Sequence, residues 1–182
     1  MFVPPVVIVC GPPAAGKTAL ARMLSVELGL PILSKDSLKE AMMDHLGGAP
    51  GVGEAAFGVQ FALARELLAS GVGMILEGAF FADQWELTEV AGHADAVVVR
   101  LECPLEILER RYAERVGDAG RHPSHRGLEA LPDLRSRVLS GAYDPPDLGR
   151  PVLRVDTTDG TKPSKDEIVR WVRDQLGATR DA

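Results

Sequence analysis

The feature that most constrains this sequence is a glycine-rich loop between an apolar run and a helical pattern. Residues 6–10 (VVIVC) form a continuous apolar run rich in β-branched side chains, which is typical of a strand buried on both faces of a parallel sheet. The loop occupies residues 11–18, and residues 17–28 have apolar side chains at helical spacing. A strand, a glycine-rich loop and a helix in this order can curl backbone N–H groups around an anion.

The loop, GPPAAGKT, matches the pattern GxxxxGK[ST], the Walker A motif, in full. Its glycines let the backbone turn so that N–H groups point at phosphate oxygens, and the helix that follows adds its positive end. Lys17 is expected to reach the β- and γ-phosphates, and Thr18 to offer its hydroxyl to Mg²⁺. ATP with Mg²⁺ is the expected ligand, and GTP remains an alternative. The predicted nucleotide-binding residues of this loop are Gly11, Pro12, Pro13, Ala14, Ala15, Gly16, Lys17 and Thr18.

Composition narrows the class of protein further. The chain has 182 residues, of which 46% are hydrophobic and 25% charged, and this usage fits one globular domain spanning 1–182. The net charge of −6 argues against a general nucleic-acid binder, which usually has a basic excess. No apolar stretch reaches about 18 residues, so we expect no membrane span. The first residues lack a basic region, so we expect no signal peptide.

The cysteines bear on the compartment. Cys10 and Cys103 are the two cysteines, and neither has a partner at metal-binding spacing. We expect both to be reduced, packed thiols, which together with the missing signal peptide predicts a cytoplasmic protein. Monomer and homodimer both remain open.

Strands and helices are predicted to alternate along the rest of the chain. Short apolar runs predict strands at 31–33, 74–77, 96–101 and 152–155. Helical spacing predicts helices at 36–46, 55–69, 83–91, 104–115 and 133–139, and a last helix capped by Ser164 that runs to 176. This alternation is typical of an α/β domain with a parallel sheet. Ligands of such domains bind at the carboxyl ends of the strands, where candidate side chains should be sought.

Asp36 follows the second predicted strand and is the candidate catalytic base. Its carboxylate would accept a proton from an attacking hydroxyl group. The alternative is a plain helix N-cap, a position for which Ser34 also qualifies. Beside a phosphate loop, the catalytic interpretation is favoured.

Glu77 ends the third predicted strand, and two aromatic residues follow it closely. Glu77 is expected to hold Mg²⁺ through water or to bind the acceptor, with a solvated strand-end carboxylate as the alternative. Phe80 and Phe81 would either stack on a ring of the acceptor or fill the core, and both interpretations stay open. Trp85, a little further on, is interpreted as a packing residue.

Arginines follow Pro104 along a predicted helix and the loop beyond it. Arg111 and Arg115 are four residues apart and so share a helix face, while Arg121 and Arg126 lie in the Gly- and His-rich residues 117–128, which are expected to be mobile. Arginines on a closing lid can neutralise charge in phosphoryl transfer. The alternative is a solvated helix face, which is favoured for Arg110. In the same loop His122 and His125 are expected to contact phosphate when protonated rather than zinc.

This combination of segments resembles the P-loop kinases related to adenylate kinase, shikimate kinase and the kinase domain of polynucleotide kinase. It most closely resembles the AAA domain family of small kinases, which also includes chloramphenicol phosphotransferase-like enzymes. The likeness covers nearly the whole chain. The segments that carry it are Gly11–Thr18, Ser34-Lys35-Asp36 with Lys39, Leu76-Glu77-Gly78-Ala79-Phe80, Leu101-Glu102-Cys103-Pro104 with Arg111 and Arg115, and Val155-Asp156-Thr157-Thr158.

The resemblance implies a three-layer P-loop nucleoside-triphosphate hydrolase fold, with a five-stranded parallel sheet of order 2-3-1-4-5 and a helical lid near residues 116–130. It implies that Asp36 is the base, that Arg111 lies against the adenine and that Arg115 reaches phosphate. It also implies that the segment after the fifth strand borders the adenine. The residues of that segment are Asp156, Thr157 and Thr158.

Two departures from the family pattern matter. Polynucleotide kinases carry an arginine three residues after the base, where this chain has Lys39. A lysine is a point charge rather than a planar fork, so recognition of a 3′-phosphate there is weakened. The phosphate loop also lacks the middle glycine that is common in close relatives.

The leading hypothesis is an ATP-dependent kinase that phosphorylates a hydroxyl group of a small metabolite or antibiotic. Lys17, Asp36 and Arg115 would be its catalytic residues. The residues expected to bind the acceptor are Asp36, Lys39, Glu77, Phe80 and Phe81. One alternative is a 5′-hydroxyl polynucleotide or nucleoside kinase, although nucleic acid is the less favoured acceptor. A second alternative is a nucleotide-dependent switch or an ATPase without an acceptor.

Overall fold

The structure is a computed structural model that describes residues 3–47 and 49–178. Strands and helices alternate, with two α-helices between the second and third strands and two more between the fourth and fifth. The strands are β1 (Pro5–Cys10), β2 (Ile32–Ser34), β3 (Met74–Glu77), β4 (Asp95–Glu102) and β5 (Val152–Asp156). The helices are α1 (Lys17–Leu28), α2 (Lys35–Leu46), α3 (Val52–Ala69), α4 (Trp85–Gly92), α5 (Leu105–Val116), the 3₁₀ helix η1 (Leu128–Ala130), α6 (Leu131–Leu139) and α7 (Lys165–Ala178).

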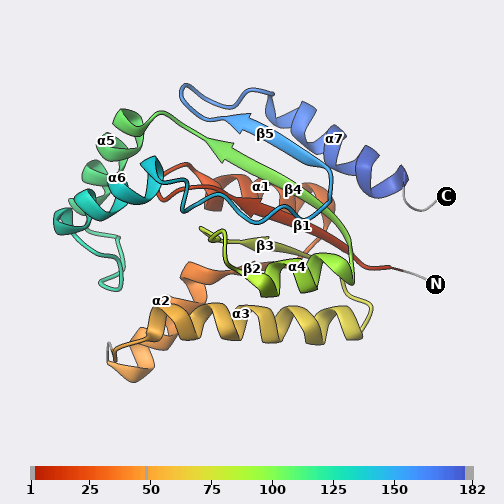
Figure 1. The fold of residues 1–182 in the computed structure, drawn as a ribbon, viewed down its shortest axis with the longest axis horizontal. Helices are drawn as coiled ribbons and strands as arrows, with labels where there is room; N and C mark the ends of the chain where they lie inside the picture. Colours follow the sequence, from red (N-terminus) through yellow and green to blue (C-terminus); the bar gives the residue numbers. More distant parts are fainter. Residues whose placement is uncertain (1–2, 48, 179–182) are drawn as a thin grey trace.

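The five strands form one parallel sheet in the order β2-β3-β1-β4-β5, which confirms the predicted fold class (Figure 1). The central strand β1 pairs with β3 on one side and with β4 on the other, so that Val7 is level with Ile75 and Val97. Parallel strands need crossover connections, and the helices supply them. All five carboxyl ends therefore lie at one edge of the sheet.

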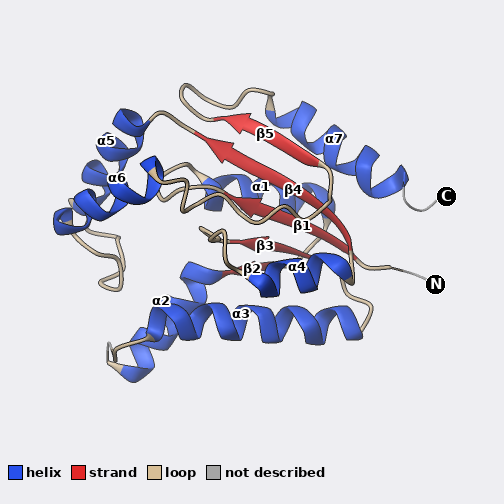
Figure 2. Cartoon of the chain, in the orientation of Figure 1, coloured by secondary structure: helices blue, strands red, loops and turns tan. Residues whose placement is uncertain are grey.

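Alternate residues of β1 pack into opposite layers. Val7 and Val9 belong to a core cluster with side chains of α1, α5 and α7, whereas Val6 and Ile8 belong to a second cluster with side chains of α3 and α4. Figure 2 shows the resulting three layers, with helices on both sides of the sheet. The unbroken apolar run in the sequence thus reflects burial on both faces.

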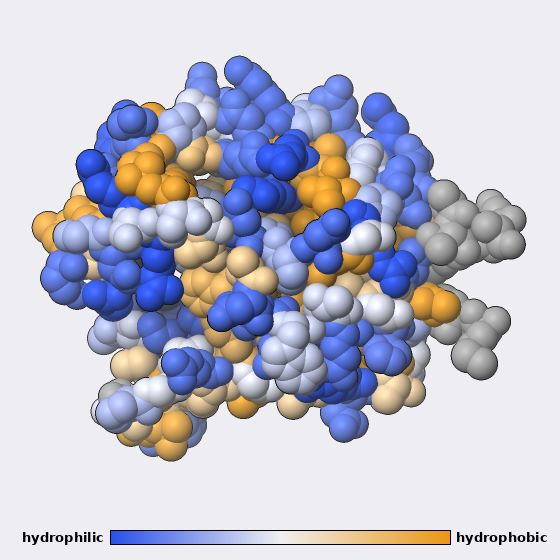
Figure 3. Space-filling model, viewed as in Figure 1, coloured by the Kyte–Doolittle hydropathy of each residue, from blue (hydrophilic) through white to orange (hydrophobic). Residues whose placement is uncertain are grey.

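The surface fits this arrangement. On the face seen in Figure 3, hydrophilic residues predominate and exposed apolar residues form separate patches. Among the described residues, no helix combines the length and apolar character needed to cross a membrane.

Glycine geometry moves one predicted boundary. Helix α3 begins at Val52 rather than at 55, because Gly51 adopts a positive φ of 83° and its carbonyl oxygen accepts hydrogen bonds from the N–H groups of Glu54 and Ala55. The connector between α2 and α3 is correspondingly shorter than the sequence suggests.

The structure also decides which residue caps α2 and whether Trp85 is a packing residue. Ser34 is the N-cap of α2, and its hydroxyl accepts a hydrogen bond from the N–H of Ser37 at 3.5 Å, so the interpretation of Asp36 as the cap is wrong. Trp85 begins α4 two residues later than predicted and is 65% exposed, so its interpretation as a packing residue is also wrong.

Both cysteines are free thiols, as predicted. Cys10 is fully buried at the end of β1, and this burial raises the pKa of its thiol to about 12. Cys103 is partly buried and its sulfur accepts a hydrogen bond from Arg111 Nη1 at 3.5 Å.

Gly11 is the residue on which the junction of β1 with the phosphate loop depends. It has a positive φ of 136°, and a Cβ atom there would lie 2.5 Å from the carbonyl oxygen of Leu101 in β4. Gly11→Ala should therefore destabilise the fold by about 3 kcal/mol, through backbone strain and overpacking together. Denaturant unfolding measures this change.

Gly58→Ala is the matched control. Gly58 lies within α3, and no heavy atom lies within 4 Å of a Cβ built there. The substitution should stabilise the protein by about 0.5–1 kcal/mol, because alanine loses less backbone entropy than glycine in a helix. Equal stability of the two variants would contradict the proposed close approach at Gly11.

Candidate active site

A cavity of about 1180 Å³ opens at the carboxyl ends of the strands. It is lined by the phosphate loop, α2, α3, the segment after β3, α5, the predicted lid and α6. It brings together most of the side chains singled out in the sequence. These are Pro13, Ala14, Gly16, Lys17, Thr18, Asp36, Lys39, Glu77, Phe81, Arg115, Arg121 and Arg126.

The phosphate loop has the backbone geometry of an anion cradle. Gly11 and Gly16 have positive φ, and Ala14, with φ of 66°, is the one non-glycine residue among those described that does. Ala14 thus adopts the left-handed conformation although it is not a glycine, at some cost in strain. No side chain caps the start of α1, so the N–H groups of its first turn stay available for phosphate oxygens.

Lys17 lies in the wall of this cradle and is only 8% exposed. Its Nζ donates a hydrogen bond to the carbonyl oxygen of Pro12 at 2.8 Å. Burial lowers the pKa of Lys17 from its usual value, and the nearby carboxylates of Glu77 and Asp36 oppose this shift. A phosphate oxygen, which is charged, would be a stronger acceptor for this ammonium than a neutral carbonyl.

The Glu77 side chain connects the start of α1, which follows β1, with the start of α2, which follows β2. Its Oε1 accepts a hydrogen bond from Thr18 Oγ1 at 3.4 Å, and its Oε2 accepts one from Ser34 Oγ at 2.5 Å. Gln60 Nε2 donates to the carbonyl oxygens of Glu77 and Leu33, at 3.0 and 2.7 Å. Glu77 is 1% exposed, so the solvated strand-end interpretation of this residue is wrong.

The pair of Thr18 and Glu77 fits a magnesium ion. A hydroxyl and a carboxylate are hard oxygen ligands of the kind Mg²⁺ prefers, and both line the cavity beside the phosphate loop. Within residues 3–47 and 49–178, no group of three or more His, Cys, Asp or Glu could hold a metal by itself. Mg²⁺ here would take its remaining ligands from phosphate oxygens and water.

Asp36 lies in the first turn of α2 and carries a carboxylate that stays ionised. Lys35 Nζ lies 3.4 Å from Asp36 Oδ1. Burial tends to raise the pKa of Asp36, but the charges of Lys35, Lys17 and His125 outweigh it and lower the pKa below its usual 3.8. A carboxylate that is ionised at neutral pH can orient a hydroxyl group and accept its proton.

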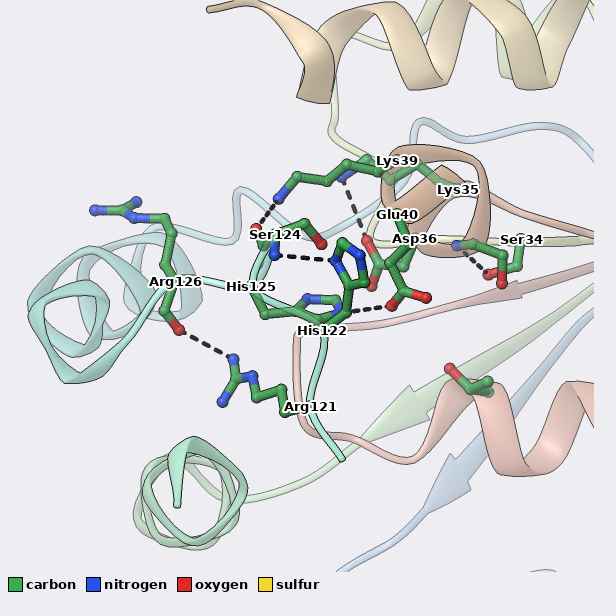
Figure 4. A network of polar contacts seen from close by, with 12 residues as sticks. Ser34, Lys35, Asp36, Lys39, Glu40, Arg121, His122, Ser124, His125 and Arg126 are labelled. Atoms are coloured by element: carbon green, nitrogen blue, oxygen red, sulfur yellow. Dashed lines mark hydrogen bonds and ion pairs between the residues drawn. The ribbon is translucent and has the colours of Figure 1, made fainter. Parts of the chain in front are cut away.

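The predicted lid lies against α2 (Figure 4). Lys39 Nζ donates to the carbonyl oxygen of Ser124 at 2.7 Å, and His125 Nε2 donates to Glu40 Oε1 at 2.7 Å. The ring nitrogen His122 Nδ1 accepts from the N–H of Ser124 at 3.0 Å. Its Nε2 therefore carries the proton and donates to Asp44 at 2.9 Å. We call these three contacts the lid latch.

The arginines of α5 and the predicted lid differ in whether their side chains already have hydrogen-bond or ion-pair partners. Arg126 forms an ion pair with Asp133 at 3.0 Å. Arg121 Nη2 donates to the carbonyl oxygen of Arg126, and its guanidinium lies over the ring of Tyr112. Its Nη1 is buried and has no partner among the residues that the structure describes. Arg115 has no side-chain hydrogen bond or ion pair with any described residue, which leaves it available for phosphate.

Two further arginines of α5 have structural contacts. Arg110 is 63% exposed and pairs with Glu114 at 3.8 Å, as its predicted solvated position requires. Arg111 Nη2 donates to the carbonyl oxygens of Thr157 and Thr158, at 2.7 and 3.1 Å. Arg111 and the segment 156–158 therefore lie together, but outside the lining of the large cavity.

Of the two aromatic residues predicted to contact the acceptor, one lies in the core and the other lines the cavity. Phe80 is fully buried in the core beside Phe61, so its predicted contact with the acceptor is wrong. Phe81 lines the cavity. Sequence reasoning missed three further aromatic residues of the cavity lining, which are Phe57, Tyr112 and Tyr143. Phe57 follows the ordinary apolar spacing of α3, and neither Tyr112 in α5 nor Tyr143 in a loop belongs to a motif.

A phosphate cradle between β1 and α1 and a parallel sheet of order 2-3-1-4-5, with arginines on α5 beside the cradle, are typical of the class of P-loop kinases. The model of the AAA domain family matches residues 6–139, and the chain belongs to this family.

Solved structures resemble the chain over almost its full length. A candidate kinase from Chloroflexus aurantiacus J-10-fl is 31% identical with a TM-score of 0.82, and the match covers 96% of this chain and 99% of that one. A gluconokinase from Sinorhizobium meliloti 1021 is 21% identical, with a TM-score of 0.60 and coverage of 98% and 94%. A shikimate kinase from Acinetobacter baumannii is 18% identical, with a TM-score of 0.50 and coverage of 97% and 94%. The last two show likeness of fold. No curated protein matches the sequence.

Lys17→Met tests the cradle without knowledge of the acceptor. The nucleotide-free variant should be at least as stable as the wild type, because folding disfavours the charged form of this buried lysine. For the same reason the wild type, unlike the variant, should gain stability as the pH rises toward 10.5. Thermal unfolding against pH measures both effects.

The same variant should lose most of its response to nucleotide. A hundredfold excess of MgATP over its Kd stabilises a binding protein by about 2.7 kcal/mol. Loss of a charged hydrogen bond removes about 1.5–3 kcal/mol of binding. Lys162→Met, at an exposed position, should keep the full response. A full MgATP shift in Lys17→Met would contradict the cradle.

Lys39→Met and Glu40→Ala test the lid latch. Each removes one contact worth about 1 kcal/mol, so the lid should open about fivefold more often. Tryptic cleavage after Arg121 and Arg126, followed by mass spectrometry, should speed up accordingly. Lys165→Met in α7 is the control and should cleave as the wild type does. Unchanged cleavage in both latch variants would show that the lid is held by other contacts.

Proposed function

We propose that this P-loop kinase transfers the γ-phosphoryl group of ATP to a hydroxyl group of a small molecule. The observation that carries the proposal is that Lys17 and Asp36 line one cavity and lie close enough for each charge to shift the pKa of the other. A phosphate cradle with an ionised carboxylate beside it is what phosphoryl transfer to an alcohol requires.

The side chains divide the work as follows. Lys17 and the N–H groups at the start of α1 bind the β- and γ-phosphates, and Thr18 offers its hydroxyl to Mg²⁺ with Glu77 behind it. MgATP supplies the phosphoryl group, with its charge partly neutralised by the metal. Asp36 orients the acceptor hydroxyl and accepts its proton as the hydroxyl oxygen bonds to the γ-phosphorus; the bond from that phosphorus to the β,γ-bridging oxygen breaks and ADP leaves. Arg115 stabilises the negative charge on the transferring group.

Arg111 with Asp156, Thr157 and Thr158 is the proposed border of the adenine. The hydrogen bonds from Arg111 to the carbonyl oxygens of Thr157 and Thr158 support this, since they join α5 to the segment after β5. ATP with GTP as an alternative, a cytoplasmic location and a monomer or homodimer complete the proposal.

A small acceptor is favoured over nucleic acid because two cationic side chains near Asp36 already have partners within the protein. Lys39, the counterpart of the arginine of polynucleotide kinases, donates to the lid, and Arg126 pairs with Asp133. A polyanion would have to break these contacts, and the chain as a whole carries a net charge of −6. The gluconokinase and shikimate kinase of similar fold agree with a small-molecule acceptor.

Asp36→Asn tests the proposal. ADP release is screened against a panel of hydroxylated metabolites, and the active acceptor is then used with the variant. The substitution should lower kcat by about 10²- to 10⁴-fold, because the amide cannot take the proton, while the affinity for ATP stays within about threefold. Asp174→Asn in α7, an exposed position, is the control.

Two outcomes would overturn the proposal. If Asp36→Asn phosphorylated the acceptor at nearly the wild-type rate, Asp36 would not be the catalytic base. ATP hydrolysis that no hydroxyl compound accelerates would favour the switch or ATPase, and binding of an oligonucleotide with a steep salt dependence would favour the polynucleotide kinase.

A further inference from the structure

Three aromatic rings from three separate parts of the chain meet in the wall of the large cavity. Phe57 comes from α3, Phe81 follows β3, and Tyr143 precedes β5. The Phe57 and Phe81 ring centroids are 6.1 Å apart in an edge-to-face arrangement, and those of Phe81 and Tyr143 are 5.7 Å apart and stacked. We call these three rings the aromatic wall.

The aromatic wall differs from the core beside it. Phe61 and Phe80, which also contact Phe57, are fully buried, whereas all three rings of the wall are half-buried and line the cavity. Half-exposed rings that converge on a cavity leave apolar area that a flat ligand can cover with a gain in free energy.

The aromatic wall lies beside the proposed base. Lys35 Nζ is 3.4 Å from Asp36 Oδ1 and 5.2 Å from the centroid of the Phe57 ring. One ammonium group therefore contacts both the base and the first ring. A molecule whose ring rests on the wall would present a substituent toward Asp36, which is the geometry that a phosphoryl acceptor needs.

The charges around the aromatic wall disfavour an anionic acceptor. The guanidinium of Arg137 lies 5.5 Å from the Phe81 ring centroid and forms an ion pair with Asp133 at 2.9 Å. Lys35 pairs with Asp36, as described above. Glu54 lines the same cavity and has no side-chain hydrogen bond or ion pair with any described residue. In the described part of the chain, the two cations that lie over rings of the wall are thus each paired with a carboxylate. A carboxylate or phosphate on the acceptor would have to compete with Asp36 or Asp133 for them.

Tyr143 adds a polar group to this wall. Burial raises the pKa of Tyr143, so its hydroxyl stays protonated at neutral pH. That hydroxyl has no hydrogen-bond partner in the described part of the chain. It can donate to a neutral polar substituent of a ligand.

We propose that the aromatic wall of Phe57, Phe81 and Tyr143 binds a planar ring of the acceptor, and that the acceptor is a neutral or cationic aromatic alcohol. This inference rests on the proposed function, because it takes Asp36 as the site to which the hydroxyl is presented. It excludes acidic sugars and other anionic polyols as the preferred acceptor.

The test compares ligands that differ in one ring. Phenyl β-D-glucoside and methyl β-D-glucoside share their hydroxyl groups, and gluconate is the anionic comparison. Binding is measured by saturation-transfer-difference NMR at millimolar ligand, with Mg²⁺ and the β,γ-methylene analogue of ATP present. The phenyl compound should bind about three- to tenfold more tightly than the methyl compound, with the strongest transfer to its ring protons.

The variants remove or keep the rings. Phe81→Leu and Tyr143→Leu should abolish the preference for the phenyl compound, whereas Phe81→Tyr and Tyr143→Phe, which keep an aromatic ring, should retain most of it. Thermal unfolding confirms that each variant folds. Equal binding of the two glucosides, tighter binding of gluconate, no binding of any of them, or an unchanged preference in both leucine variants would each overturn the proposal.

The two proposals fail in different ways. If the phenyl compound binds at the wall but no alcohol accelerates ADP release, the wall stands as a binding site, while the kinase assignment and the acceptor role of the wall fail. If polyols are phosphorylated with loss of activity in Asp36→Asn but without any effect of Phe81→Leu, the kinase assignment stands and the wall does not bind the acceptor.

Discussion

The arrangement of this site depends on one buried carboxylate. Glu77 is almost completely shielded from water, and a buried charge must be satisfied by hydrogen bonds. The hydroxyls of Thr18 and Ser34 supply them, and these residues stand at the starts of α1 and α2. One side chain therefore fixes the phosphate loop relative to the helix that carries Asp36. The contact ties the phosphate loop to the N-terminus of α2 through the sheet rather than through loops at the surface.

Much of the scaffold is predictable from local sequence. The apolar runs, the Walker A loop and the alternation of elements predict a parallel α/β sheet and most helices to within a few residues, because each is a short-range signal of spacing or capping. The order of the strands follows only from the resemblance to the P-loop kinases. Ser34 and Asp36 show the limit of such signals, since either residue can cap α2 and the decision lies in the pairing of Ser34 with Glu77 across the sheet.

What the sequence could not predict is long-range. Phe80 and Phe81 are adjacent and chemically alike, and only the packing of α3 decides that the first enters the core and the second lines the cavity. The ring of Tyr143 stacks on that of Phe81 although the two residues are 62 positions apart, and no periodic pattern in the sequence predicts this contact. The contact of Lys39 with Ser124 spans 85 positions and turns a candidate ligand-binding lysine into part of the lid latch.

Helix α2 carries Asp36 in its first turn and the three partners of the lid further along its length. Its 12 residues span about 18 Å as a single rigid rod. Residues 122–125 of the predicted lid are therefore tied to the same helix that carries the proposed base.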